Sequence, residues 1–185
     1  MQSAAQPSLE DEADFSEFSE LMESAQRSAV FLQMRDLYNV SEEAEDFAIW
    51  RRTGQQDLDP DSTYWAPYVK LISRAVARGV AIRRARIVSE PVSDSIRYLH
   101  QAVVVNTHAG EQVRWLPRRL ASDITLPGND FWLFDDRLIR WNHFDGDGAV
   151  TAHEISDDPA TVKLCVTAFE AVWARAIPHA QYELQ

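Results

Sequence analysis

The segment that most constrains the fold is GNDFWLFDDR, residues 128–137, in which four bulky apolar residues stand between two aspartates. Side chains of a strand alternate between its two faces, so this run would present apolar groups on both sides. A strand that is apolar on both faces belongs inside a sheet that other elements cover. The flanking aspartates, Asp130 and Asp135, would end that strand, and ligands of α/β proteins often bind at strand ends.

Other segments predict helices and strands in an order that favours an α/β sheet. Helices are predicted over 14–25, from an N-cap at Ser41, over 62–78, from Ser93 or Asp94, and over 158–178. Strands are predicted over 29–38, 80–89, 112–117, 130–135, 137–144 and 149–155, with turns at Asp135–Asp136 and at DGDG, 145–148. Because helices separate the earlier strands, crossovers must connect them. We therefore expect an α/β domain, bordering on α+β, whose helices flank a mixed sheet that ends in an antiparallel hairpin and a helix.

The length of 185 residues fits one domain with a sizeable core, and we assign that domain to residues 13–185. Residues 1–12 are polar and charged without periodicity, which predicts a disordered acidic leader. The formal net charge is −11, and residues 1–24 carry seven acids but no lysine or arginine. No apolar run approaches the roughly 18 residues of a membrane span, so we expect a cytoplasmic protein without membrane contact.

A basic stretch contrasts with the acidic N-terminal part, because residues 62–89 contain six basic residues and no acid. The six residues are Lys70, Arg74, Arg78, Arg83, Arg84 and Arg86. The stretch could bind an anionic partner, and nucleic-acid binding of this kind would weaken steeply with salt. The whole chain is acidic, however, so we do not expect direct nucleic-acid binding. Pairing between the stretch and the acidic leader is an alternative use of the same charges.

Motifs for several common chemistries are missing from the sequence. It contains no nucleophile elbow G-x-S-x-G, no P-loop and no G-x-G-x-x-G. A calcium loop that began at Asp145 would need glycine where Val150 stands and glutamate where Ser156 stands. The single cysteine, Cys165, lies among apolar residues of a predicted helix, and one cysteine excludes an intrachain disulfide and a cysteine-built zinc site. We therefore expect neither a metal nor another cofactor.

Two histidines leave an enzymatic alternative open. His143 and His153 lie on adjacent predicted strands on either side of the DGDG turn, so they could approach one another. Glu154 follows His153 in sequence but should point to the opposite face of the sheet. A metal site would need further ligands that the sequence does not nominate, so partly buried strand histidines are the simpler interpretation.

Several stretches of the chain resemble an uncharacterised actinobacterial family. They are RDLYNVSEEAEDFAIW, RIVSEPVSDSIRYL, VRWLPR, NDFWLFDDR and DDPATVKLCVTAFEAVWARAIP. The resemblance runs from about Phe31 to Tyr182 and leaves the acidic leader outside it. Members of that family tend to be encoded beside helix-turn-helix regulators in filamentous soil bacteria, and no activity is established for them. The resemblance therefore implies a partner, a helix-turn-helix regulator protein, and names no reaction.

The last third of the chain resembles the half-domain of the phospholipase D superfamily, because a hairpin after FWLFDDR precedes a helix that reads FEAVWARAIP. Active members carry His-x-Lys-x4-Asp where the strand begins. If Asp135 takes the aspartate position, the histidine falls on Gly128 and the lysine on Asp130. Glycine cannot attack phosphorus and a carboxylate would repel phosphate, so this alignment implies a remnant site without catalytic residues.

These observations lead us to expect a non-enzymatic accessory or sensor protein that works with a helix-turn-helix transcription regulator through protein contacts, with a small ligand as a further option. Candidate binding residues are Asp130 and Asp135, with Arg97 and Arg114 as the nearest basic groups. Superfamily half-domains often pair about a two-fold axis, so the resemblance also implies a homodimer. The alternative is a divergent phosphodiesterase or toxin-like nuclease that uses one of the two strand histidines.

Overall fold

The computed structural model describes residues 9–39 and 44–185, and its centre is a seven-stranded sheet in the order β6-β5-β4-β1-β2-β3-β7. The strands are β1 (Ser28–Gln33), β2 (Ala81–Val88), β3 (Gln112–Pro117), β4 (Asp130–Phe134), β5 (Leu138–Phe144), β6 (Val150–Ser156) and β7 (Ile177–Pro178). β1, β2 and β3 are parallel to one another, whereas the other neighbouring strands pair antiparallel. The sheet is therefore mixed, as predicted.

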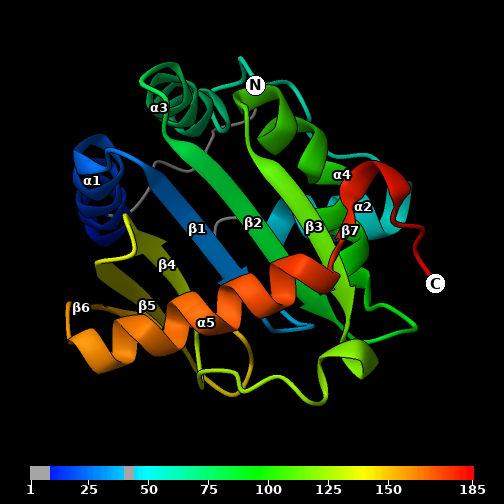
Figure 1. The fold of residues 1–185 in the computed structure, drawn as a ribbon. Helices are drawn as coiled ribbons and strands as arrows, with labels where there is room; N and C mark the ends of the chain where they lie inside the picture. Colours follow the sequence, from blue (N-terminus) through cyan, green and yellow to red (C-terminus); the bar gives the residue numbers. More distant parts are fainter. Residues whose placement is uncertain (1–8, 40–43) are drawn as a thin grey trace.

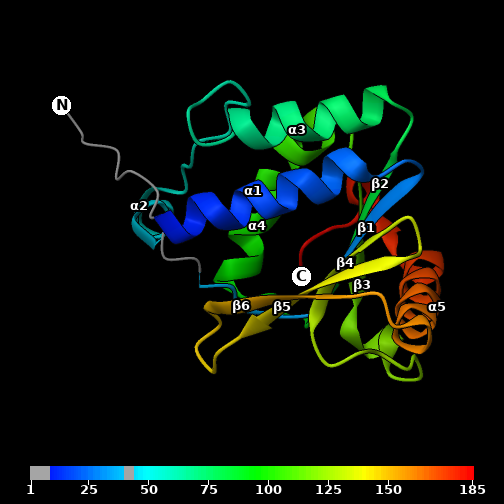
Figure 2. The ribbon, with the colours of Figure 1, turned by 90° about the vertical axis from the view of Figure 1, so that its left-hand side faces the viewer.

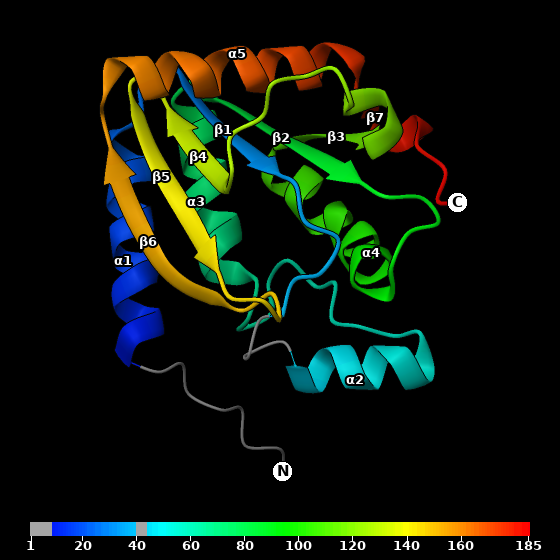
Figure 3. The same ribbon diagram turned by 90° about the horizontal axis from the view of Figure 1, so that it is seen from below.

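Helices cover both faces of this sheet. They are α1 (Leu9–Ser24), α2 (Ala44–Thr53), α3 (Ala66–Ala77), α4 (Asp94–Ala109) and α5 (Pro159–Arg175), with the short 3-10 turns η2 (Arg118–Ala121) and η3 (His179–Gln181). Figures 1 and 3 show α5 across one face and α1, α3 and α4 on the other. Figure 2 shows α1 lying next to α3, with α5 on the far side of the sheet. The predicted α/β class is confirmed. Within the described part of the chain, no helix is both long and apolar enough to cross a membrane.

The strand β4 is buried on both sides, as the run FWLF predicts. Phe131 and Leu133 pack in a cluster with residues of α5, among them Phe169. Trp132 and Phe134 pack on the opposite face with residues of α1 and α3. Each of these four strand residues is at most 4% exposed, so β4 joins the two halves of the hydrophobic core.

The predicted strands are present, and all but one of them differ from the prediction by at most one residue at each end. The strand predicted over 112–117 has these bounds in the structure. The strand predicted over 29–38 is shorter, because the chain leaves the sheet after Gln33 and continues as the loop 34–39. This difference bears on function, since the loop lies at the edge of the sheet where β1 ends.

The N-terminal part can be compared with its prediction only from Leu9 onward. Residues 1–8 of the predicted leader, and the N-cap predicted at Ser41, lie outside the described residues. Helix α1 begins at Leu9, so the helix predicted from residue 14 starts earlier than expected. The division into a disordered leader and a domain over 13–185 stays a prediction.

One residue of the basic stretch, Arg78, holds the end of α1. Its guanidinium donates hydrogen bonds to the backbone carbonyls of Met22 at 2.9 Å, Glu23 at 3.2 Å and Ala25 at 3.4 Å. The last carbonyl groups of a helix have no partner within the helix, so a cation at this position satisfies them. Arg78 is therefore occupied by the N-terminal helix.

Arg140 on β5 holds the same helix nearer its start. The Arg140 side chain is 4% exposed, and it forms ion pairs with Asp14 and Glu17 of α1. The guanidinium also lies 5.9 Å from the centre of the Phe18 ring. These two acids of the N-terminal part therefore pair with an arginine outside the basic stretch.

Candidate functional site

Three parallel strands end at one edge of the sheet, and a pocket opens there. The loops after β1, β2 and β3 gather at this edge, where the antiparallel strand β4 begins (Figure 3). Sheets of α/β proteins commonly bind ligands outside the carboxyl ends of their strands. The pocket has a volume of about 290 Å³. It is lined by Met34, Arg35, Arg118, Leu126, Pro127, Gly128, Asn129, Asp130 and Phe144.

Arg118, the first residue after β3, ties the loop 34–39 to the end of β2. Its guanidinium donates to the carbonyl oxygens of Met34 at 2.5 Å and Ile87 at 3.3 Å. The same group donates to the Ser89 hydroxyl at 3.0 Å and to the Asp36 carboxylate at 3.2 Å. Because four acceptors share one guanidinium, the side chain is held in place while 40% of it stays exposed.

Asp130 is a buried carboxylate at the start of β4, and both of its oxygens accept hydrogen bonds. Oδ1 accepts the backbone N–H of Met34 at 2.8 Å, and Oδ2 accepts the Tyr38 hydroxyl at 2.6 Å. Burial raises the pKa of Asp130 above its ordinary value, although these hydrogen bonds and the charges of Arg86 and Arg35 oppose the rise. In this structure, hydrogen bonds to both oxygens therefore hold the carboxylate in the pocket wall.

The loop 34–39 is also bound to the hairpin turn between β5 and β6. Arg35 donates through Nη2 to the carbonyl oxygen of Asp145 at 3.3 Å. The backbone N–H of Asn39 donates to the carbonyl oxygen of Gly148 at 2.9 Å. The pocket wall and this turn therefore form one hydrogen-bonded unit.

The backbone of Gly148 requires glycine, and replacing this residue tests whether the contact between the loop and the turn stabilises the fold. It has a φ of +86°, and a Cβ added there would lie 2.9 Å from the carbonyl oxygen of Leu37. We expect Gly148→Ala to lower the free energy of unfolding by about 1–2 kcal/mol, because both the backbone conformation and the new contact are unfavourable. Gly146→Ala is the matched control, since Gly146 lies in the same turn and a Cβ there meets nothing within 4 Å. Urea unfolding compares the two, and equal losses would contradict this role of Gly148.

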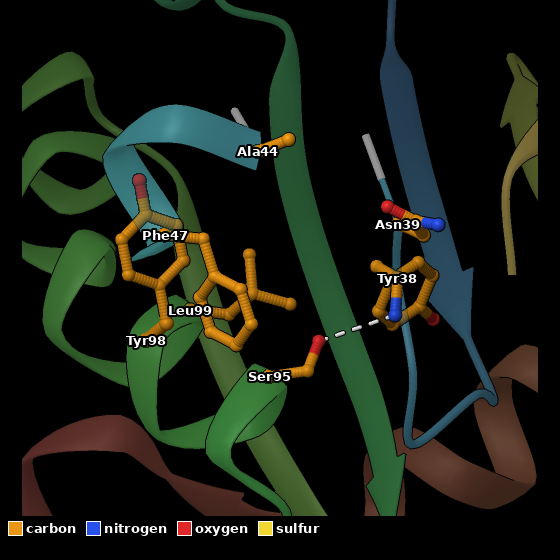
Figure 4. Close-up of a pocket in the computed structure, with 7 residues that line it drawn as sticks. All are labelled: Tyr38, Asn39, Ala44, Phe47, Ser95, Tyr98 and Leu99. Atoms are coloured by element: carbon orange, nitrogen blue, oxygen red, sulfur yellow. Dashed lines mark hydrogen bonds between the residues drawn. The ribbon is translucent and has the colours of Figure 1, made fainter. Parts of the chain in front are cut away.

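A second, smaller cavity lies between the loop 34–39, α2 and α4. Its volume is about 20 Å³, and Figure 4 shows Tyr38, Phe47, Tyr98 and Leu99 around it. The backbone N–H of Tyr38 donates to the Ser95 hydroxyl at 3.1 Å, which fixes the loop against α4 (Figure 4). A space that holds about one water molecule is a feature of packing, so we assign the ligand site to the larger pocket.

Asp135 lies at the opposite end of β4 from Asp130, so the structure does not bring the two predicted carboxylates together. The length of β4 separates them by roughly 16 Å at the rise per residue of a strand. The Asp135 carboxylate accepts the backbone N–H groups of Gln26 at 2.9 Å, Arg27 at 2.7 Å and Ser28 at 3.0 Å. Burial raises the pKa of Asp135, but these hydrogen bonds outweigh burial and hold the pKa below its ordinary value. Asp135 therefore anchors the start of β1.

Neither of the predicted basic neighbours joins Asp130. Arg114 points to the α5 side of the sheet, where its guanidinium lies 4.3 Å from the centre of the Trp173 ring and donates to the Trp173 carbonyl. The reason is the alternation of β3, which turns Trp115 and not Arg114 toward the α4 side. Arg97 lies on α4 and is not among the residues that line the pocket.

The two histidines of the enzymatic alternative lie on opposite faces of the sheet. His143 pairs with Ala152, and His153 pairs with Asn142, across the ladder between β5 and β6. His143 contacts Glu154 at 3.1 Å on one face, whereas His153 contacts the Asn142 side chain at 2.9 Å on the other. The prediction that the two histidines could approach one another is wrong, because their registers differ by one residue. In the described part of the chain, no group of three or more His, Cys, Asp or Glu side chains is placed to hold a metal ion.

The six residues of the basic stretch do not form one surface. Lys70 and Arg74 are exposed on α3, whereas Arg78 is occupied by the end of α1. On β2, Arg83 forms an ion pair with Glu170 of α5 on one side of the sheet. Arg84 and Arg86 point to the other side and are buried. The stretch is therefore divided between solvent and both faces of the sheet.

Comparison with known protein families matches nearly the whole chain. Residues 16–184 match a family described as "Domain of unknown function (DUF6879)". The chain belongs to the DUF6879 family. The predicted membership of an uncharacterised family is confirmed, and the DUF6879 match contains every residue that lines the pocket.

Two solved structures are similar to this DUF6879 chain at low sequence identity. One is a phospholipase D family member, Nuc from Salmonella typhimurium, with a TM-score of 0.48 and 11% identity over 91% of this chain and 90% of that one. The other is TrmBL2, an archaeal chromatin protein, with a TM-score of 0.47 and 14% identity over 88% of this chain and 49% of that one. The sequence matches none of the curated proteins with which it was compared. The finer assignment to a phospholipase D-like half-domain stays a prediction.

The residues at the pocket that the sequence analysis did not nominate follow the three parallel strands. Arg35 and Arg118 line the pocket, whereas Asp36 and Ser89 hold the Arg118 guanidinium. Arg35 and Asp36 follow β1 within three residues, and Ser89 and Arg118 directly follow β2 and β3. Arg118 directly follows the strand predicted over 112–117, so its position at a strand end was a usable signal. Ser89 was hidden because it was predicted as the last residue of its strand. Arg35 and Asp36 were hidden because the strand was predicted to continue through residues 34–38.

Proposed function

We propose that this DUF6879 domain is a non-enzymatic sensor, which binds a small ligand in the pocket at the carboxyl edge of its sheet and acts on a protein partner. The observation that carries the proposal is the pocket of about 290 Å³, where Arg35, Arg118 and Asp130 stand beside apolar side chains. A concave site with a few fixed polar groups among apolar ones is typical of small-molecule binding.

The chemistry of the pocket wall favours binding over turnover. The described residues that line it include no cysteine, serine, histidine or lysine, which are common nucleophiles and proton carriers in enzymes. Asp130 is the carboxylate in this lining, and hydrogen bonds from the protein occupy both of its oxygens. Under the phospholipase D alignment, Gly128 and Asp130 stand where that chemistry needs histidine and lysine.

The partner that we propose is a helix-turn-helix transcription regulator. The support is the resemblance of the sequence to a family whose members tend to be encoded beside such regulators. A complex of this kind would act in the cytoplasm, and pairing of two copies about a two-fold axis would match the symmetry of a dimeric regulator. The proposal does not require the basic stretch to contact DNA.

Capture of the tagged full-length chain from its native host tests this partnership. We expect mass spectrometry to find a helix-turn-helix protein in stoichiometric amount. A folded and abundant sample that recovers no such protein would contradict the proposed partner.

Arg118→Ala is expected to weaken binding to the captured partner by about tenfold or more. The guanidinium organises the loop 34–39 as well as the pocket wall, and a hydrogen bond to a charged group is worth roughly 1.5–3 kcal/mol. Arg119→Ala is the matched control, because Arg119 is adjacent, its side chain is 71% exposed, and its carboxylate partner Glu90 lies 3.9 Å away. Isothermal titration of the purified partner measures the affinities, and equal affinities of the two variants would argue against a role for the pocket.

A further inference from the structure

Two arginines on the same face of β2 have very different surroundings. Arg84 contacts Glu111 at 2.8 Å, Gln33 at 3.0 Å and Tyr68 at 2.7 Å, so its guanidinium is fully used. Arg86 is 4% exposed, and its Nε and Nη1 have no hydrogen-bond partner among the described residues. Buried polar groups of proteins are almost always hydrogen-bonded, so these two nitrogens require an explanation.

The charge of Arg86 is retained although it is buried. Burial, together with the nearby charge of Arg84, lowers the pKa of Arg86 to about 10, which still leaves the group protonated at neutral pH. The contact that the structure supplies is the Trp115 ring, whose centre lies 5.5 Å from the guanidinium carbon. A buried cation without a hydrogen-bonded anion destabilises a fold, so its presence is better explained by a ligand than by stability.

The strand register places Arg86 near Asp130 in the pocket wall. Arg86 is opposite Gln33 of β1, and the preceding residue of β1, Leu32, is opposite Phe131, which follows Asp130 on β4. The charge of Arg86 acts on the pKa of Asp130, which lines the pocket, and on the pKa of Tyr38, which donates to Asp130. Arg35 also acts on Asp130 and lines the pocket, and its buried Nε has no partner among the described residues. Three guanidinium nitrogens of two arginines therefore lack hydrogen-bond partners among the described residues, and both arginines act on the same carboxylate.

We infer that Arg86, together with Arg35, anchors an oxyanion group, a carboxylate or a phosphate, on the ligand of this pocket. The inference rests on the proposed function and adds the chemical class of the ligand. A guanidinium presents its N–H groups as a planar fork, which suits an oxyanion better than a neutral acceptor. Asp130 lines the pocket in this structure and Arg86 does not. The Asp130 carboxylate would repel the anion, so the inference requires Asp130 to leave the Tyr38 hydroxyl and move aside when the anion binds.

Titration of the full-length chain with inorganic phosphate, and separately with acetate, tests the inference. Both anions are compared with chloride at constant ionic strength, by thermal unfolding and by the ¹H–¹⁵N signals of the arginine Nε–H groups. We expect a saturable rise of the melting temperature and a shift of the Arg86 Nε–H signal with one of the two anions. A response to phosphate identifies a phosphate-bearing ligand, and a response to acetate identifies a carboxylate.

Variants of Arg86 supply the second measurement. Arg86→Met is expected to fold at least as stably as the wild type in chloride, because it removes a buried cation. Its apparent Kd for the anion should be weaker by about tenfold or more. Arg86→Lys keeps the charge but loses the planar fork of N–H groups, so its Kd for the anion should be weakened by a similar factor. This variant replaces Arg86→Met in the test if the methionine variant does not fold. Arg83→Met is the matched control, since it removes a charge from the same strand on the opposite face and should leave the Kd unchanged.

The outcomes separate this inference from the proposed function. Wild-type affinity in both Arg86 variants would overturn the inference. If that affinity were instead lost in Arg35→Met, the pocket would remain a ligand site and Arg86 would have no part in it. A wild-type chain that responds to neither anion would also overturn the inference, whereas capture of a regulator would still support the proposed function.

Discussion

Replacing Arg84 with methionine is expected to lower the free energy of unfolding by about 3–5 kcal/mol. The change leaves the Glu111 carboxylate, whose side chain is 0% exposed, without the cation that lies 2.8 Å from it. Burial raises the pKa of Glu111, but the charge of Arg84 and the hydrogen bonds from Arg84, Tyr68 and Asn106 together outweigh burial and hold the pKa below its ordinary value. Without Arg84 the effect of burial remains. The loss of unfolding free energy in Arg84→Met should therefore become smaller as the pH falls and Glu111 takes up a proton. Urea unfolding over a series of pH values measures both effects.

Arg83→Met is the matched control for this loss. Arg83 precedes Arg84 on β2 and points to the other face of the sheet, where it pairs with Glu170 at 2.7 Å. The Glu170 side chain is 52% exposed, and exposed ion pairs contribute up to about 1 kcal/mol. A deficit in Arg84→Met no larger than that in Arg83→Met would contradict the structural role of the buried pair.

Asp135→Ala is expected to lower the free energy of unfolding by about 2–3 kcal/mol, because three backbone N–H groups lose their common acceptor. Asp136→Ala is the matched control, since Asp136 is the next residue and has the same φ of 52°. Both variants place alanine in left-handed backbone, so the difference between them isolates the Asp135 carboxylate. Equal losses in chemical denaturation would show that the turn conformation, and not the carboxylate, is responsible.

The contribution of Asp135 should also depend on pH in a defined direction. Its pKa is lower in the folded chain than in the unfolded chain, where an aspartate has a pKa of about 3.9. The stabilisation is therefore fully present above the unfolded pKa, and it is lost as the pH falls through the folded pKa. The stabilities of wild type and Asp135→Ala should converge on acidification, and a constant gap would show that ionisation of Asp135 is not involved.

The interior position of β4 could be predicted from sequence, but the roles of its two flanking aspartates could not. A run that is apolar on both faces has few places in a fold, so FWLF specified a central strand. Asp130 and Asp135 are equivalent in such a pattern, because each ends the same strand. Their roles are decided by β1, which brings Met34 to one end and Ser28 to the other. Such pairings between distant segments do not appear in local periodicity.

The two buried arginines of β2 show a similar limit. Arg84 and Arg86 have the same residue type, strand and face, and the sequence pattern treats them as one basic stretch. Their difference depends on Glu111, which lies between α4 and β3 and contacts Arg84 from the start of this neighbouring strand. Composition could report that six basic residues lie close in sequence. It could not report that one of them is paired in the interior and another is left with unused donors.

The hydrogen bonds between the loop 34–39 and the turn that precedes β6 couple the pocket wall to the outer hairpin of the sheet. Any displacement of the pocket wall pulls on Asn39 and Arg35, and through them on Gly148 and the hairpin. Among the described residues, β6 is the outermost strand on that side of the sheet and pairs with no strand along its outer edge, where a further strand could add. A protein that paired with this edge would therefore respond to ligand binding in the pocket without contacting the ligand.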